Sequence, residues 1–162
     1  MNKIKLSEEG RAHIPVNMKL YNDSLLEKVI FKLDTGADLT TINKKDLVIL
    51  GYSKEWIKEN AVKSLTCTIS GAGGKIESAY YVVVPISNIL GRDLHNWTFY
   101  IRMDDDKDFP NLLGIDILLN FNFTFNYDIG FLSIEPACNP IIKKQMIKNQ
   151  RIEDINKSEK II

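Results

Sequence analysis

The sequence VIFKLDTGADLTT, at Val29–Thr41, is the stretch on which the fold and the function depend. Its first residues are mainly apolar and predict a buried strand, which Gly36 ends. The strand delivers one carboxylate, Asp34, into a turn made of Thr35, Gly36 and Ala37. A carboxylate beside apolar residues must be hydrogen-bonded, paired or protonated, because low-dielectric surroundings destabilise its charged form. This pattern is typical of an active-site loop.

Two other segments strengthen this interpretation. Ser70–Gly74 (SGAGG) is a glycine-rich tip between strand-like stretches, and Asn111–Leu119 (NLLGIDILL) is a second apolar segment interrupted by glycine. With Leu33–Ala37 (LDTGA) they resemble, in order, the catalytic loop, the flap and the second core segment of retropepsin-like aspartic proteases, the family that includes the retroviral proteases. The resemblance covers residues 12–136.

The resemblance implies a mainly β fold, in which a closed retropepsin-like β-barrel carries a flap hairpin, a few short helices and a helical or disordered C-terminal tail. We expect a flexible N-terminus at 1–11, a protease domain at 12–138 and a lysine-rich tail at 139–162. The implied catalytic residues are Asp34, Thr35 and Gly36. The implied substrate-binding residues are Ala37 and Asp38 in the loop and Ser70, Gly71, Ala72, Gly73 and Gly74 in the flap.

The loop holds only one carboxylate of the pair that aspartic-protease chemistry needs, in which one group is protonated and the other acts as base toward water. Asp128 is followed by Ile129 and lacks the hydroxyl neighbour that Thr35 gives to Asp34. Asp116 lies at the start of a predicted helix, where capping is the simpler role. We therefore predict a two-fold homodimer that brings the Asp34 side chains of both subunits together. The resemblance implies the same assembly.

One position departs from the retroviral pattern. Retroviral enzymes typically have arginine after the second glycine, where it pairs with the aspartate matching Asp38, whereas this chain has Ile115. The site therefore resembles cellular or bacterial members more than viral ones. For Asp38, substrate contact and stabilisation of the loop both remain open.

Two other functions fit parts of the pattern. A non-catalytic dimeric module of this fold could bind peptide or protein partners in the same groove, because binding does not require an aspartate pair. A purely structural β protein would leave Asp34 and the glycine-rich hairpin unexplained. Of the three, an aspartic endopeptidase acting on peptide or protein substrates accounts for most of the pattern.

The composition excludes several other classes. Of 162 residues, 44% are hydrophobic and 26% charged, as in a soluble globular domain. Lys and Arg together number 21, as do Asp and Glu, so no global charge favours nucleic acid or a membrane as partner. Cys67 and Cys138 are too few for a disulfide framework and wrongly spaced for zinc, and no metal or cofactor is expected. With no export signal in the N-terminal residues, we expect a cytoplasmic protein.

The remaining periodicity predicts the order of elements. Asn43 is expected to cap a short helix, and the aromatic residues alternating from Phe121 to Tyr127 predict a strand with one core-facing side. Strands are expected at 12–21, 29–33, 62–69, 75–84, 97–103, 121–127 and 131–135, and short helices at 44–50, 53–59 and 115–121.

Overall fold

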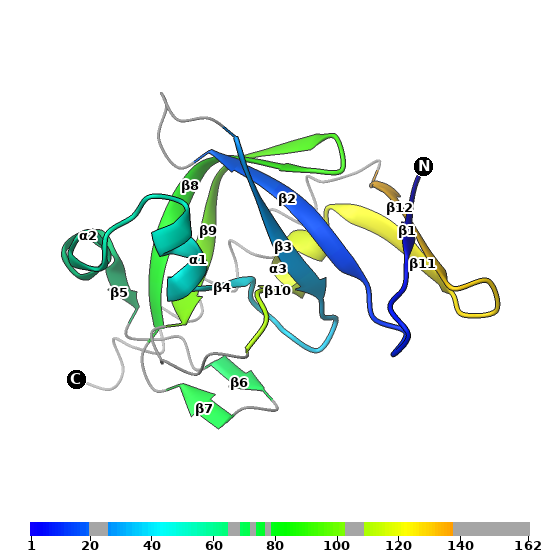
Figure 1. Ribbon diagram of the computed structural model, residues 1–162, viewed down its shortest axis with the longest axis horizontal. Coiled ribbons are helices and arrows are strands. Elements are labelled where there is room, and N and C mark those ends of the chain that lie inside the picture. The colour runs from blue at the N-terminus through cyan, green and yellow to red at the C-terminus, as the bar shows by residue number, and fades with distance from the viewer. Residues whose placement is uncertain (20–25, 65–68, 72–73, 77–78, 103–108, 138–162) are drawn as a thin grey trace, which may run out of the picture.

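The computed structural model describes residues 1–19, 26–64, 69–71, 74–76, 79–102 and 109–137 (Figure 1). Strands dominate this part of the chain, and its helices are short: α1 (Lys44–Ile49), α2 (Lys54–Asn60) and α3 (Ile115–Leu118). The expected mainly β class is confirmed. No helix among these residues is long and apolar enough to cross a membrane. The tail at 139–162 lies outside the described residues.

The predicted strands appear in the predicted order with shifted ends, and the structure adds several short strands. In chain order, the strands are β1 (Asn2–Lys5), β2 (His13–Lys19), β3 (Glu27–Leu33), β4 (Thr41–Asn43), β5 (Val62–Ser64), β6 (Ile69–Gly71), β7 (Gly74–Ile76), β8 (Ala79–Ile89), β9 (Arg92–Arg102), β10 (Leu112–Leu113), β11 (Phe121–Asn126) and β12 (Phe131–Pro136). The added short strands are β1, β4, β6 and β10.

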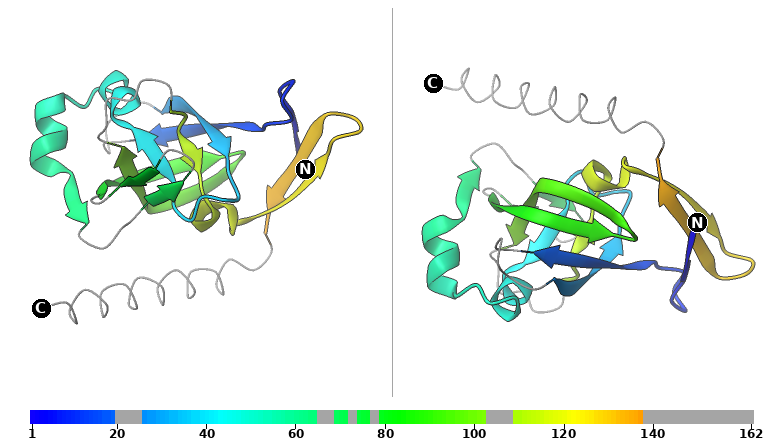
Figure 2. Two further views of the ribbon diagram at one scale, coloured as in Figure 1. Left: turned by 90° about the horizontal axis from the view of Figure 1, so that it is seen from below. Right: turned by 90° about the horizontal axis from the view of Figure 1, so that it is seen from above.

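The largest sheet has the strand order β2-β3-β10-β4-β9-β8-β5. Because β8 also pairs with β2, the hydrogen-bonded strands from β2 to β8 form a ring. Within it, β3 pairs with β10 and β4 with β9 in parallel, whereas the other pairings are antiparallel. A separate sheet, β1-β12-β11, extends to one side of this ring (Figure 2), and β6 and β7 form a hairpin.

Alternating apolar residues build the core between these strands. On β2, Ile14, Val16 and Met18 are fully buried, and on β3 Phe31 is buried against Phe99 of β9, with ring centroids 5.8 Å apart. Burying side chains of this kind stabilises the fold by about 1.5–3 kcal/mol each. The two rings pack β3, and thus the start of the Asp34 loop, against β9.

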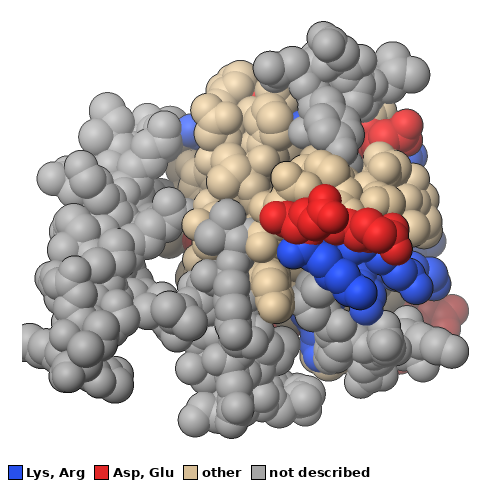
Figure 3. Space-filling view, turned by 90° about the vertical axis from the view of Figure 1, so that its left-hand side faces the viewer, with Lys and Arg blue, Asp and Glu red and all other residues tan. Residues whose placement is uncertain are grey.

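Helix α2 covers one end of the molecule and corresponds to the helix predicted at 53–59. The Ser53 side chain accepts a hydrogen bond from the backbone N–H of Trp56 (3.0 Å), and Ile57 is fully buried. The exposed positions of α2 alternate in sign, and Figure 3 shows acidic and basic side chains in adjacent rows on this face. This face therefore has no single-sign charge patch.

Asn43 differs from its predicted role. It occupies the residue before α1, but its side chain makes no capping hydrogen bond to the helix. The side-chain amide instead donates to the carbonyl of Phe109, and the backbone N–H of Asn43 donates to the Asn111 side chain (2.7 Å). Asn43 thus joins β4 to the segment that leads into β10, and a tertiary contact replaces the local one.

The N-terminal segment contains a strand that the sequence analysis did not predict. Residues 2–5 form β1 and pair with β12, and the backbone N–H of Leu6 donates to the carbonyl of Gly130 (2.9 Å). Ile4 packs against the core, in which Leu6 is buried. The sequence analysis predicted no strand here, because backbone hydrogen bonds to a distant strand do not require a strongly apolar sequence.

Two other features differ in extent. Strands β8 and β9 are longer than predicted and meet at a tight turn in which Leu90 has φ of 51° and Gly91 has φ of 88°. On β11 only Phe121 is buried, whereas Phe125 is half-buried and stacks on the exposed Tyr127 with centroids 5.6 Å apart. The aromatic side is therefore core at one end and surface at the other.

Candidate active site

The loop after β3 holds the Asp34 side chain by backbone contacts. The backbone N–H of Gly36 donates to Asp34 Oδ1 (2.9 Å), and the N–H of Ala37 donates to the carbonyl of Asp34 (3.2 Å). Asp34 is half-buried, whereas Thr35 and Gly36 are exposed. The loop thus presents an oriented carboxylate at the surface of the molecule.

Strand β10, which comes much later in the sequence, supports this loop. It lies parallel to β3, with Leu113 in register with Leu33, and the backbone N–H of Asp34 donates to the carbonyl of Leu113 (3.1 Å). Just before β10, Asn111 is buried and its carbonyl accepts from the N–H of Lys32 (2.8 Å). Asp34 is therefore positioned by a segment about eighty residues later, as the resemblance implied.

Gly114 allows the two segments to cross at close range. A Cβ atom at this position would lie 2.5 Å from the carbonyl carbon of Leu39 and 2.9 Å from the carbonyl oxygen of Ala37. Directly after it, the N–H of Ile115 donates to the carbonyl of Ala37 (2.8 Å). Only a residue without a side chain fits this crossing, so the backbone contact requires glycine.

A buried side-chain pair below the loop was missed by the sequence analysis. Thr40 Oγ1 donates to Asp116 Oδ1 (2.7 Å) and accepts from the N–H of Gly114 (3.0 Å). Burial raises the pKa of Asp116 above its ordinary value, while hydrogen bonds from Thr40, Ile117 and Trp97 act in the opposite direction. The expected capping is present in part, since Asp116 Oδ1 accepts from the N–H of Ile117 (2.8 Å). The sequence feature that could have indicated this pair was an acidic residue, Asp116, between two isoleucines.

The structure brings the predicted loop residues together and describes part of the glycine-rich hairpin that was predicted to be the flap. Asp38 is exposed, Ala37 is half-buried, and the hairpin pairs Ser70 with Lys75 and Gly71 with Gly74. Ala72 and Gly73, also predicted to bind substrate, lie outside the described residues. Figure 1 shows the β6–β7 hairpin at the same end of the molecule as the loop between β3 and β4.

Neither internal candidate for a second carboxylate belongs to the loop. Asp128 lies in the exposed turn between β11 and β12, on the smaller sheet, and Asp116 is buried and held by Thr40. Among the residues that the structure describes, no three His, Cys, Asp or Glu side chains gather where they could hold a metal ion.

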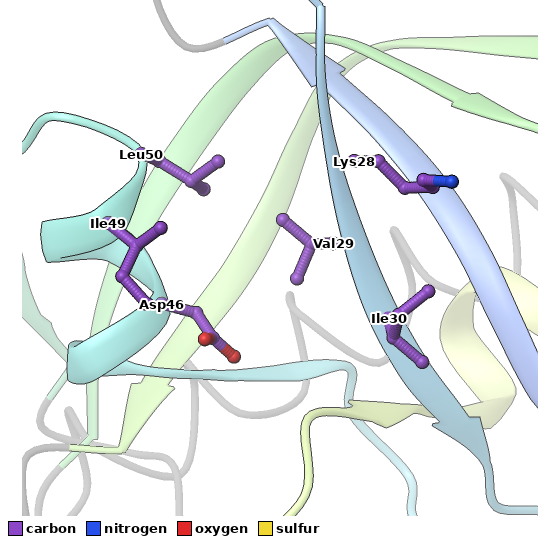
Figure 4. Close-up of a pocket in the computed structure, with 6 residues that line it drawn as sticks. All are labelled: Lys28, Val29, Ile30, Asp46, Ile49 and Leu50. Carbon is purple, nitrogen blue, oxygen red and sulfur yellow. The ribbon is translucent and has the colours of Figure 1, made fainter.

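The pocket shown in Figure 4 is separate from the loop. Its volume is about 230 Å³, and it lies between β3 and α1. The Asp46 carboxylate at its edge accepts a hydrogen bond from the Asn111 side chain. Its lining residues are Lys28, Val29, Ile30, Asp46, Ile49 and Leu50, and none of them belongs to the 34–40 loop or to the hairpin. We therefore do not assign the chemistry to this pocket.

Comparison with solved structures identifies the fold. The crystal structure of a retropepsin-like aspartic protease from Rickettsia conorii superposes with a TM-score of 0.57 at 21% sequence identity, covering 81% of this chain and 88% of that one. The chain therefore has a retropepsin-like fold, as its sequence predicted. No protein-family model matches the sequence, and no curated protein matches it.

Proposed function

We propose that the protein is an aspartic endopeptidase whose catalytic pair consists of one Asp34 from each subunit of a homodimer. The observation that carries this proposal is the surface loop in which the Gly36 N–H orients Asp34 Oδ1 (2.9 Å) while Thr35 and Gly36 remain exposed. An oriented carboxylate at an exposed loop is available to an identical loop across a two-fold axis. The retropepsin-like fold supports this reading.

The pair would act through one shared proton. Two carboxyl groups in contact cannot both ionise, so one acts as base toward a water molecule while the other donates a proton to the carbonyl oxygen of the peptide bond. The Gly36 N–H fixes one oxygen of Asp34 and leaves the other for the partner or for water. Since neither Asp116 nor Asp128 joins the loop, the pair requires two chains.

Substrate would lie between the loop and the β6–β7 hairpin. Ala37 adds little bulk beside Asp34, and the exposed Asp38 carboxylate can accept hydrogen bonds from backbone amides of an extended peptide. The hairpin pairs Gly71 with Gly74, and glycines lower the cost of the backbone changes that open and close a lid. These assignments make Ser70–Gly74 the flap.

The test is cleavage of a mixed peptide library by wild type and by Asp34→Asn. Asparagine keeps the shape and an acceptor oxygen for the Gly36 N–H but cannot share a proton, so we expect hydrolysis to disappear while thermal unfolding changes little. Asp128→Asn is the matched control, because it changes a carboxylate outside the loop, and it should cleave like wild type. Full activity of purified Asp34→Asn would refute the assignment. Peptide binding without cleavage by wild type would indicate a non-catalytic binding module.

A further inference from the structure

Below the loop, three buried polar groups form a directional chain of hydrogen bonds. The N–H of Gly114 donates to Thr40 Oγ1 (3.0 Å), and the single hydrogen of that hydroxyl is donated to Asp116 Oδ1 (2.7 Å). Thr40 is fully buried, and Asp116 is only 8% exposed. Each member of the chain depends on the next, because a hydroxyl with one hydrogen can donate to one strong acceptor only.

One end of this chain of hydrogen bonds, Gly114, lies next to the residue that supports Asp34, which is proposed to react. Leu113, directly before Gly114, accepts the backbone hydrogen bond of Asp34 (3.1 Å), while Thr40 and Asp34 lie at opposite ends of the same loop. The loop and the second segment are thus joined at both ends of the loop, at Asp34 and at Thr40, and between them by backbone hydrogen bonds such as that from Ile115 to Ala37. A shift at Thr40 moves the segment that supports Asp34.

We propose that Asp116 is a positioning residue that, through the Thr40 hydroxyl, holds the second core segment where it supports Asp34. This assignment rests on the proposed function for its effect on turnover, whereas its effect on loop position does not require catalysis. A helix-capping role alone would involve Ile117 but not Thr40. The hydrogen bond between Thr40 and Asp116 joins residues 76 positions apart and therefore concerns the crossing.

The neighbouring residue Thr41 offers a matched control for this proposal. Thr41 is also buried, at 2% exposure, and its hydroxyl has no hydrogen-bond partner within the part of the chain that the structure describes. Thr40→Val and Thr41→Val make the same chemical change at adjacent buried positions. Only the first leaves the Gly114 N–H without its acceptor and removes the hydroxyl that donates to Asp116.

The experiment measures kcat, KM and the loop amide resonances in folded, purified variants. We expect Thr40→Val and Asp116→Leu to lower kcat by about 100-fold with little change in KM, because displacement of a reacting group by about 1 Å has this effect. The amide resonances of Gly36 and Ala37 should move in both. Thr40→Ser and Asp116→Asn keep the hydroxyl and the acceptor oxygen and should restore both readouts, and Thr41→Val should resemble wild type.

A double variant tests whether the two residues act together. If Asp116 acts through Thr40, Thr40→Val with Asp116→Leu should lose no more kcat than the more damaging single change, whereas independent roles would multiply the losses. The proposal would be overturned if the two losses of kcat multiplied in the double variant. It would also be overturned if folded Thr40→Val had the kcat and resonances of Thr41→Val. If Asp116→Leu fails to fold, the near-isosteric Thr40→Val decides. If wild type cleaves nothing, the proposed function fails, and the resonances still decide the positioning role.

Discussion

Replacing Gly114 by alanine tests the crossing on which the candidate site depends. The added Cβ atom would lie 2.5 Å from the carbonyl carbon and 2.6 Å from the carbonyl oxygen of Leu39, and 2.9 Å from the carbonyl oxygen of Ala37. Ordinary contacts begin at 3.4 Å, so the two backbone segments must separate by about 0.9 Å. The neighbouring atoms are backbone, which cannot rotate away as a side-chain end can.

The cost follows from this separation. Overpacking a well-packed site costs about 1–3 kcal/mol. The same shift weakens the hydrogen bonds from the N–H of Ile115 to Ala37 (2.8 Å) and from the N–H of Asp34 to Leu113 (3.1 Å). Each is worth about 0.5–1.5 kcal/mol net, so the expected loss in the free energy of unfolding is about 2–6 kcal/mol. A typical domain has about 5–15 kcal/mol in all.

The assay is urea unfolding of wild type, Gly114→Ala and a control, at one protein concentration because a dimer's stability depends on it. Gly130→Ala is the control: this glycine has φ of 69°, and an added Cβ would meet no atom within 4 Å. Its cost is conformational and should be about 1–2 kcal/mol. If Gly114→Ala lost no more stability than Gly130→Ala, the steric argument would be refuted.

Three further predictions concern charge, packing and assembly. Burial raises the pKa of Asp116 above 3.8, so the folded state keeps its proton to higher pH, and wild type should lose stability relative to Asp116→Asn as the pH rises through the folded-state pKa. The slope is at most about 1.4 kcal/mol per pH unit, and a pH-independent difference between the two urea curves would contradict it. Leu47→Ala, at a fully buried position of α1, should cost about 2–5 kcal/mol in urea unfolding without changing kcat of the folded protein. If it cost less than Val48→Ala, on the exposed side of the helix, the argument that Leu47 packs in the core would be refuted. Specific activity should fall on dilution below the dimer dissociation constant, and sedimentation showing a fully active monomer would exclude the shared Asp34 pair.

Local pattern predicted the parts of the structure that local physics decides. The apolar residues before Asp34 and the glycine at 36 indicated a strand and a turn, and β3 and the loop occupy those positions. Alternating apolar residues predicted the strand at 12–21, where β2 lies, and the helix predicted at 53–59 is α2, whose first turn the Ser53 side chain caps. In each case the signal lies within one element.

Most contacts between distant residues were not predicted, and the approach of the second core segment to the Asp34 loop was implied only by the family resemblance. The polar residues of β1 gave no strand signal by themselves. The strand forms because they pair with a distant strand that begins at Phe131. Asn43 has a capping residue's chemistry but is used for a contact with Phe109. Thr40 and Asp116 become meaningful only once the two segments are known to cross. Pairings of this kind depend on topology, which a periodic pattern does not encode.

The pairing of β3 with β10 also has a consequence for biosynthesis. Asp34 is synthesised early, but the carbonyl that holds its backbone N–H belongs to Leu113, and the buried carboxylate that holds Thr40 belongs to Asp116. Contacts across so many residues form late in folding, since loop closure must precede them. The loop therefore cannot acquire these contacts until synthesis has passed Asp116. Chains that stop before Asp116 would thus lack the contacts that hold Asp34 and Thr40 in place.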